Sequence, residues 1–147
     1  PYDYAPEKIR DTLASHGLIQ ALFNLLPGDW EAGERGLAAL PGREAEFRSA
    51  VAQAGEYADA LQCGQVHVMA GILPDGADPA PFEEAYISNL RYAADYFAAR
   101  GVRTLIEPMD LTEETFEFQD FFSASFLLPV GVPSAGDRRD GLPCGLP

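Results

Sequence analysis

The sequence predicts an α/β domain in which short parallel strands are joined by helices, and three observations indicate this class. Segments with helical periodicity alternate with short apolar runs over residues 1–107. The apolar runs are largely continuous, which is typical of strands buried on both faces of a parallel sheet. Loops rich in Gly and Pro follow the runs, and the order of elements favours right-handed crossovers between neighbouring strands.

The first helix and the first strand are predicted near the start of the chain. Residues 6–16 begin with a proline, which suits the first turn of a helix, and Ile9 and Leu13 lie four residues apart on one helical face. The apolar run 18–23 follows and is predicted to be a buried strand that ends at Asn24.

A long loop, a second helix and a second strand come next. Residues 25–42 form a polar loop rich in Gly and Pro, and loops of this length are usually functional or disordered. Apolar residues then recur at helical spacing from residue 44 to 62, and Gly64 is expected to close this helix. The run 65–70 is predicted to be the second strand, with His67 in its middle.

The same order repeats once more before the pattern stops. Residues 71–81 form another Gly/Pro-rich loop, residues 82–100 carry a strong helical stripe, and residues 102–106 are predicted to be a third short strand. Glu107 and Pro108 follow this strand directly. No element of this kind is predicted beyond that point.

Composition excludes several classes of function. The chain has 47% hydrophobic and 22% charged residues, as a soluble globular protein does. Its formal net charge of −13 disfavours nucleic-acid binding, and no apolar run reaches the ~20 residues that span a bilayer. Cys63 and Cys144 share no metal-binding spacing. Cys63 lies in an apolar stretch and is expected to be a reduced core residue, which favours a cytoplasmic location.

Three polar residues lie at or near the ends of the predicted strands, where parallel α/β folds carry their function. Asn24 ends the first strand, His67 lies in the second, and Glu107 ends the third. Each also has a purely structural interpretation. His67 suits a hydrogen-bonded core residue, and Asn24 could satisfy backbone groups of the loop. Glu107 is expected to be largely buried, and a buried carboxylate needs an ion partner or a metal.

Several stretches together resemble the hydroxypyruvate isomerase family, within the xylose-isomerase-like barrels. The longest is the run from Asn24 to Gly36 with its Gly28-Asp29-Trp30 centre. Shorter stretches agree in order with the same family: Pro1-Tyr2-Asp3-Tyr4, Pro41-Gly42-Arg43, Val66-His67-Val68-Met69-Ala70-Gly71, Asn89-Leu90-Arg91-Tyr92-Ala93-Ala94 and Leu105-Ile106-Glu107-Pro108.

The resemblance implies a partial (β/α)₈ barrel that holds about strands 3–5 and helices 2–4. It assigns residues 1–110 to this partial TIM-barrel domain. Residues 111–147 are expected to be an irregular, poorly ordered tail, because Gly and Pro recur throughout its second half. A full barrel takes ~250 residues, so the chain is expected to be truncated at both ends.

The resemblance also implies a reaction and a set of site residues. The family interconverts hydroxypyruvate and tartronate semialdehyde by moving a proton between adjacent carbons through an enediolate. Glu107 matches the first of two family glutamates, a metal ligand that also transfers the proton. Asn24 and His67 match positions near the substrate, and Phe23 stands where the family often has His. The implied cofactor is Mg²⁺ or Mn²⁺, held by oxygen ligands.

The sequence leaves two alternative functions open. A related isomerase or epimerase of the same barrels, such as a 2-oxo-tetronate isomerase, is one. The partner in either case is a small hydroxy- or oxo-acid. A non-catalytic module that forms homo-oligomers through exposed barrel edges is another, because an open parallel sheet leaves strand edges uncovered. The chain alone is expected to be inactive, because one catalytic glutamate cannot serve both faces of the substrate.

Overall fold

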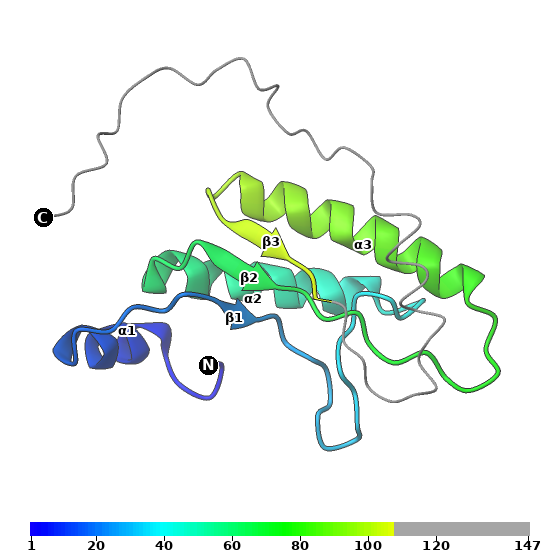
Figure 1. The fold of residues 1–147 in the computed structure, drawn as a ribbon, viewed down its shortest axis with the longest axis horizontal. Helices are drawn as coiled ribbons and strands as arrows, with labels where there is room; N and C mark the ends of the chain where they lie inside the picture. Colours follow the sequence, from blue (N-terminus) through cyan, green and yellow to red (C-terminus); the bar gives the residue numbers. More distant parts are fainter. Residues whose placement is uncertain (108–147) are drawn as a thin grey trace, which may run out of the picture. The chain divides into compact units, whose positions relative to one another are not determined.

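The computed structural model of the chain describes residues 1–107 (Figure 1). They form three helices and three strands in alternation: α1 (Pro6–Ser15), β1 (Phe23–Asn24), α2 (Glu44–Leu61), β2 (Gln65–His67), α3 (Ala80–Ala98) and β3 (Arg103–Leu105). The tail predicted over residues 111–147 lies outside the described residues.

The strands form one parallel sheet in the order β1-β2-β3, as the alternating pattern predicts. Helix α2 packs between α1 and α3, and α2 and α3 lie on the same face of the sheet (Figure 1). Consecutive strands are therefore neighbours joined by helical crossovers, which is the repeating unit of a (β/α)₈ barrel.

Helix α2 forms where the apolar periodicity predicts it. Phe47, Val51 and Ala54 recur on its inner face and are fully buried. The end of the helix differs from the prediction, because the chain leaves the helix at Gln62 and not at Gly64. Gln62 adopts the left-handed conformation (φ 52°), and its backbone N–H donates to carbonyls of the last turn. Gln62 thus takes the left-handed position that glycine usually fills at the end of a helix.

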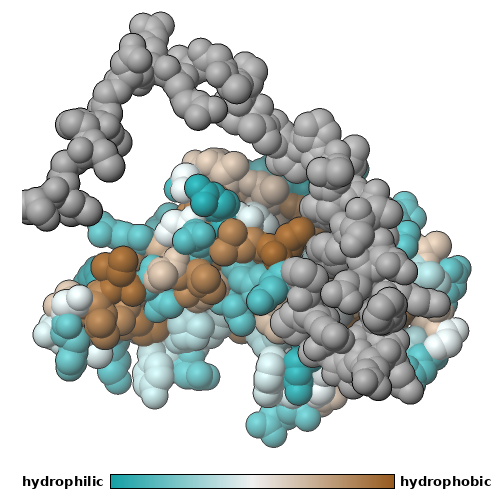
Figure 2. Space-filling model, in the orientation of Figure 1, coloured by the Kyte–Doolittle hydropathy of each residue, from teal (hydrophilic) through white to brown (hydrophobic). Residues whose placement is uncertain are grey.

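The prediction for the apolar run 18–23 is wrong over most of its length. Only its last residue enters β1, and Ile19 is 89% exposed. The strand β1 stands at one edge of the described sheet. No other described element covers the segment that leads into it, so its side chains stay in contact with solvent. Figure 2 shows apolar side chains gathered over this part of the molecule.

The loop between β1 and α2 contains buried apolar residues, although its composition is mainly polar with several Gly and Pro residues. Leu37, Ala38 and Ala39 are buried. The backbone N–H of Ala39 donates to the Ala70 carbonyl at 2.7 Å, so this returning segment lies beside the chain that continues from β2. The buried amide of Asn89 on α3 donates to the Ala38 carbonyl at 2.9 Å. The loop is therefore held to the sheet on one side and to α3 on the other.

Two further findings concern single elements. The Cys63 thiol is free and its side chain is buried, as predicted from the apolar stretch around it. Among residues 1–107, no helix has both the length and the apolar character that a membrane crossing requires.

Gly36 allows the returning segment to approach the sheet closely. Its φ is 137°, and an added Cβ would collide with the Met69 carbonyl and lie 2.6 Å from the Gly71 nitrogen. Gly33 provides a comparison within the same loop, because its φ of 92° is also positive but an added Cβ would meet nothing.

We expect Gly36→Ala to lower the free energy of unfolding more than Gly33→Ala. Both variants add the strain of a positive φ, about 1–2 kcal/mol, but only Gly36→Ala also forces two backbones apart, which adds about 1–3 kcal/mol. Urea denaturation followed by circular dichroism measures both. Equal losses would show that the close approach at Gly36 does not stabilise the fold.

Candidate functional site

The site residues predicted from β1 and β2 meet at one edge of the sheet. Asn24 lies directly opposite His67 in the parallel register, and His67 lies opposite Leu105 of β3. The Asn24 Oδ1 atom and the His67 Nδ1 atom are 3.1 Å apart and form a hydrogen bond. The convergence predicted from the sequence is thus confirmed for Asn24 and His67.

His67 has a polar atom that the described protein leaves unpaired. Its side chain is 6% exposed, and Nδ1 donates to Asn24 when the amide oxygen accepts. The other ring nitrogen, Nε2, is buried and has no hydrogen-bond partner among the described residues. An unpaired buried acceptor lowers stability unless another molecule donates to it. The geometry therefore fits a residue that is both part of the core and able to accept a hydrogen bond.

Tyr2 belongs to this edge, although no local sequence pattern predicts it as a site residue. Its hydroxyl donates to the Asn24 carbonyl at 3.0 Å, and its ring lies 5.0 Å from that of Tyr57. Burial raises the pKa of the Tyr2 phenol well above its ordinary range, and the neighbouring Tyr57 adds to this effect. The hydroxyl therefore stays a donor. The resemblance of Pro1-Tyr2-Asp3-Tyr4 to a family strand end was the only signal for it.

Glu107 lies where the sequence places it, but its surroundings differ from the prediction. It follows Leu105 by two residues at the carboxyl end of β3, and it is exposed rather than largely buried. Among residues 1–107 it has no hydrogen bond or ion pair. The reason is that β3 is an edge strand of the described sheet, with a partner only on the β2 side.

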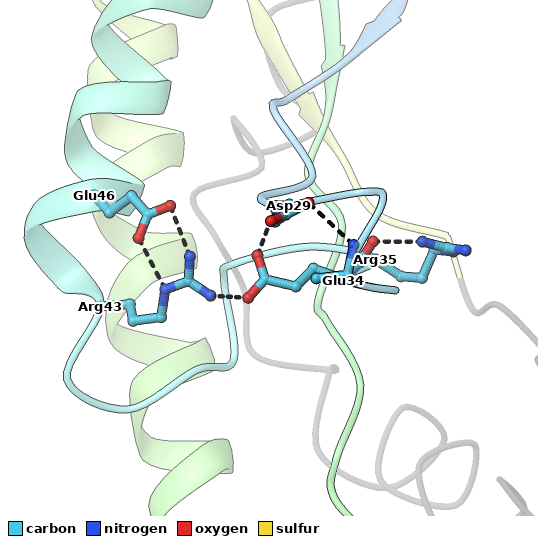
Figure 3. A network of polar contacts seen from close by, with 6 residues as sticks. Asp29, Glu34, Arg35, Arg43 and Glu46 are labelled. Atoms are coloured by element: carbon cyan, nitrogen blue, oxygen red, sulfur yellow. Dashed lines mark hydrogen bonds and ion pairs between the residues drawn. The ribbon is translucent and has the colours of Figure 1, made fainter.

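A network of charges shapes the loop above this edge (Figure 3). Glu34 accepts hydrogen bonds from the Arg43 guanidinium and from the backbone N–H of Asp29. Arg43 also binds Glu46 through two hydrogen bonds of 2.7 and 2.8 Å. The Arg43 contact, aided by the Asp29 N–H, holds the pKa of Glu34 below its ordinary value. The start of the loop is thereby tied to the start of α2.

Trp30 and Arg35 form a second feature of the same loop. The Arg35 guanidinium lies 3.7 Å from the centre of the Trp30 ring. Its Nη1 donates to the backbone carbonyls of Trp30 at 3.2 Å and of Glu34 at 2.7 Å. Trp30 itself is 54% exposed, so it anchors the loop through its partner and not through burial in the core.

The described residues do not form a metal site by themselves. Residues 1–107 contain no group of three His, Cys, Asp or Glu side chains placed to hold a metal ion. The exposed Glu107 carboxylate is a suitable oxygen ligand, but one carboxylate does not complete the coordination of a divalent ion.

Comparisons with known proteins agree on a single family. A family model described as "Xylose isomerase-like TIM barrel" matches residues 1–125. A 2-oxo-tetronate isomerase from Cupriavidus necator is 53% identical over 110 residues, which cover 75% of this chain and 42% of the relative. The hydroxypyruvate isomerase of Escherichia coli is 44% identical and covers 75% of this chain and 43% of the relative.

A solved structure supports the same fold. The crystal structure of a protein described as "AP endonuclease, family 2" from Brucella melitensis superimposes with a TM-score of 0.72 at 50% identity. The match covers 75% of this chain and 42% of that one. This likeness and the family match confirm the predicted fold class, a partial TIM barrel.

The comparisons also show how much of the relatives this chain represents. It spans about half of their length, from 42% to 53%. A human relative, 43% identical, matches over 95% of the chain. Similarity to the family thus extends beyond residue 108, where the stretches that resemble the family end.

The Glu34 contacts predict how the loop responds to acid. Because the pKa of Glu34 is lowered in the folded loop, its stabilising contribution is complete above the ordinary carboxyl pKa. It is lost as the pH falls through the lowered value. Trp30 is the only tryptophan of the chain, so its fluorescence emission reports on this loop. We expect an emission change in that acidic range.

Glu34→Gln should remove this acidic transition, and Glu83→Gln on α3 should leave it unchanged. Both variants lose one carboxylate, but only the first belongs to the network with Arg43. An identical acid titration in Glu34→Gln would assign the emission change to another group and contradict the prediction.

Proposed function

We propose that this chain, which belongs to the xylose isomerase-like TIM barrel family, carries part of the active site of an isomerase for short hydroxy- and oxo-acids. The proposed reaction interconverts hydroxypyruvate and tartronate semialdehyde. Relatives named hydroxypyruvate isomerase and 2-oxo-tetronate isomerase, at 44% and 53% identity, support this class of substrate. A 2-oxo-tetronate is the alternative substrate, and the 53% identity to the 2-oxo-tetronate isomerase favours it.

One observation carries the proposal: His67 Nε2, next to Asn24 at the carboxyl edge of the sheet, is buried and has no hydrogen-bond partner among residues 1–107. In barrels of this kind the carboxyl ends of the strands form the active site. We propose that a substrate hydroxyl donates to His67 Nε2. The amide group of Asn24 then fixes the ring through Nδ1, which sets the tautomer that accepts at Nε2.

Glu107 is proposed as a proton-transfer group of the same site. Its exposed carboxylate at the end of β3 can take the proton from the carbon next to the substrate carbonyl. The resulting enediolate then takes a proton at the former carbonyl carbon from a second acid outside the described residues. The hydroxyl proton passes from its oxygen to the neighbouring oxygen, which leaves an aldehyde at one carbon and a hydroxyl at the other. Positioned general bases of this type accelerate reactions by about 10²–10⁴-fold.

The divalent metal stays a separate proposal. Mg²⁺ or Mn²⁺ would use Glu107 as one ligand, and its remaining ligands would come from outside the described residues, since residues 1–107 lack a complete set. A cytoplasmic location also stays a prediction, supported by the free thiol of Cys63. Nucleic acid is disfavoured as a substrate by the net charge of −13.

A non-catalytic interaction module is the second candidate, and the exposed apolar run before β1 favours it. Leu18, Ile19 and Leu22 are 59%, 89% and 44% exposed, directly before an edge strand. Apolar patches and open strand edges of this kind commonly mark interaction sites. We propose that, in this role, a second copy of the chain covers the run.

A chimeric enzyme tests the isomerase proposal. Residues 1–107 replace the matching segment of the Cupriavidus necator relative, so that the remaining barrel is supplied. We expect isomerisation of hydroxypyruvate or a 2-oxo-tetronate, measured by NMR. Glu107→Gln should lower the rate by about 10²–10⁴-fold because it removes the proton acceptor.

Two controls make this test decisive. Glu56→Gln should retain activity, since Glu56 is exposed in the second half of α2, and each helix runs from the carboxyl ends toward the amino ends of the parallel strands. The chain alone with Mg²⁺ or Mn²⁺ should give no turnover. A folded chimera without activity, or one indifferent to Glu107→Gln, would contradict the proposal.

The oligomerisation proposal has its own test. Sedimentation of the chain should reveal a species larger than the 15.9 kDa monomer, and Ile19→Glu should return it to monomer by placing a charge in the apolar contact. Ser88→Glu on the exposed surface of α3 is the matched control and should leave the assembly intact. A wild-type monomer at micromolar concentration would rule out self-association through this run.

A further inference from the structure

We propose that Arg35, stacked on Trp30, is a preformed binding site for the carboxylate of the substrate. This inference rests on the proposed function, because it assigns the group that recognises the acid end of a hydroxy- or oxo-acid. It adds a specificity-determining residue on the loop between β1 and α2, separate from Asn24, His67 and Glu107.

The first argument is that the guanidinium is held in a fixed orientation before any ligand arrives. The Trp30 ring lies 3.7 Å away from it. Two backbone carbonyls accept from the same nitrogen, Nη1, at 2.7 and 3.2 Å. The side chain is only half-exposed. A planar fork that is already ordered loses little entropy when it binds a carboxylate through two parallel hydrogen bonds.

The second argument is that no acidic residue of the described part of the chain neutralises the charge of Arg35. No carboxylate of residues 1–107 forms an ion pair with it. The adjacent Glu34 is engaged by Arg43 and by the Asp29 N–H, and Asp29 Oδ1 accepts from the backbone N–H of Ala32. In Figure 3 the Arg35 side chain points away from the pair formed by Glu34 and Arg43. The network therefore engages Glu34 and Asp29 with groups other than the Arg35 guanidinium.

Arg43 shows the contrast within the same loop region. Its guanidinium binds Glu34 and Glu46 and leaves no charge for a ligand. In a chain with a net charge of −13, a cation without an acidic partner has a strong tendency to attract one. A positive charge that is held on an ordered loop without an acidic partner among residues 1–107 has the properties of an anion-binding site.

The third argument concerns position. Arg35 precedes Gly36, which bridges Ala70 on the chain that continues from β2. Ala70 lies three residues beyond His67, a separation of roughly 10 Å along an extended chain. Arg35 thus stands above the carboxyl edge that holds Asn24 and His67. A long arginine side chain and a three-carbon acid together span this separation, with the hydroxyl toward His67 and the carboxylate toward Arg35.

The experiment measures binding and not turnover, using hydroxypyruvate as the probe. Dihydroxyacetone is the matched neutral ligand, because it replaces the carboxylate by a hydroxymethyl group of similar size. Isothermal titration of the full chain gives the affinities, and Trp30 emission gives a local signal, since this is the only tryptophan. We expect saturable binding of hydroxypyruvate that weakens with added salt, and binding of dihydroxyacetone at least tenfold weaker.

Two variants and one control assign the site. Arg35→Gln should weaken hydroxypyruvate binding at least tenfold and bring it to the level of dihydroxyacetone. Arg35→Lys keeps the charge but loses the planar fork, so an intermediate affinity is expected. Arg48→Gln removes a cation that lies over the Tyr92 ring between α2 and α3, and it should leave the affinity unchanged.

The outcomes separate this inference from the proposed function. Carboxylate binding that depends on Arg35, with an inactive chimera, supports the inference while the isomerase proposal fails. An active chimera whose Michaelis constant for the acid is unchanged in Arg35→Gln overturns the inference alone. Absence of hydroxypyruvate binding by the wild-type chain, or wild-type affinity in a folded Arg35→Gln variant, also overturns it.

Discussion

The site depends on one backbone contact: the returning segment of the first long loop pairs with the chain that continues from β2. The Ala39 N–H reaches the Ala70 carbonyl, and Gly36 bridges the same residue. Asn89 secures the other side of this segment through the Ala38 carbonyl. Without this pairing the loop backbone would have no fixed position relative to the strand ends, and the distance between Arg35 and His67 would not be defined.

The remaining features of the loop build on that contact. Glu34 and Arg43 tie the outward part of the loop to the start of α2, and Trp30 packs against Arg35. These interactions lie at the surface, where single ion pairs contribute little to overall stability. Their effect is on shape: each restricts a loop that would otherwise sample many conformations. The structure thus combines a firm backbone anchor with several weak contacts that orient side chains.

The sequence predicted the fold class and the order of elements well, for physical reasons visible in single segments. Helix α2 was located to within a residue at each end, because its apolar residues follow the helical period. The run before β1 was misjudged because apolar composition does not reveal whether another element covers a strand. Likewise, the Gly and Pro residues of the first loop concealed the burial of Leu37 and its neighbours.

The site was predictable in part. The convergence of Asn24 and His67 follows from the meeting of strand ends in parallel folds, and the register places the two residues opposite each other. Their roles toward a substrate stay predictions. Tyr2 was missed because its contact joins residues 22 positions apart, and no local pattern encodes such a contact. That Arg35 has no acidic partner among residues 1–107 depends on the contacts of its neighbour Glu34, which binds Arg43. Such contacts follow from the folded loop, and composition alone does not contain them.

The close approach of Gly36 and Gly71 has a consequence for how such a loop can change over time. Each glycine lacks the Cβ that would strike the backbone of the other segment, so the contact joins main chains and is indifferent to neighbouring side chains. The backbone path of the loop therefore depends on this main-chain contact and not on the side chains that the loop carries. Side chains of the loop can therefore be exchanged while these two glycines preserve the path of its backbone.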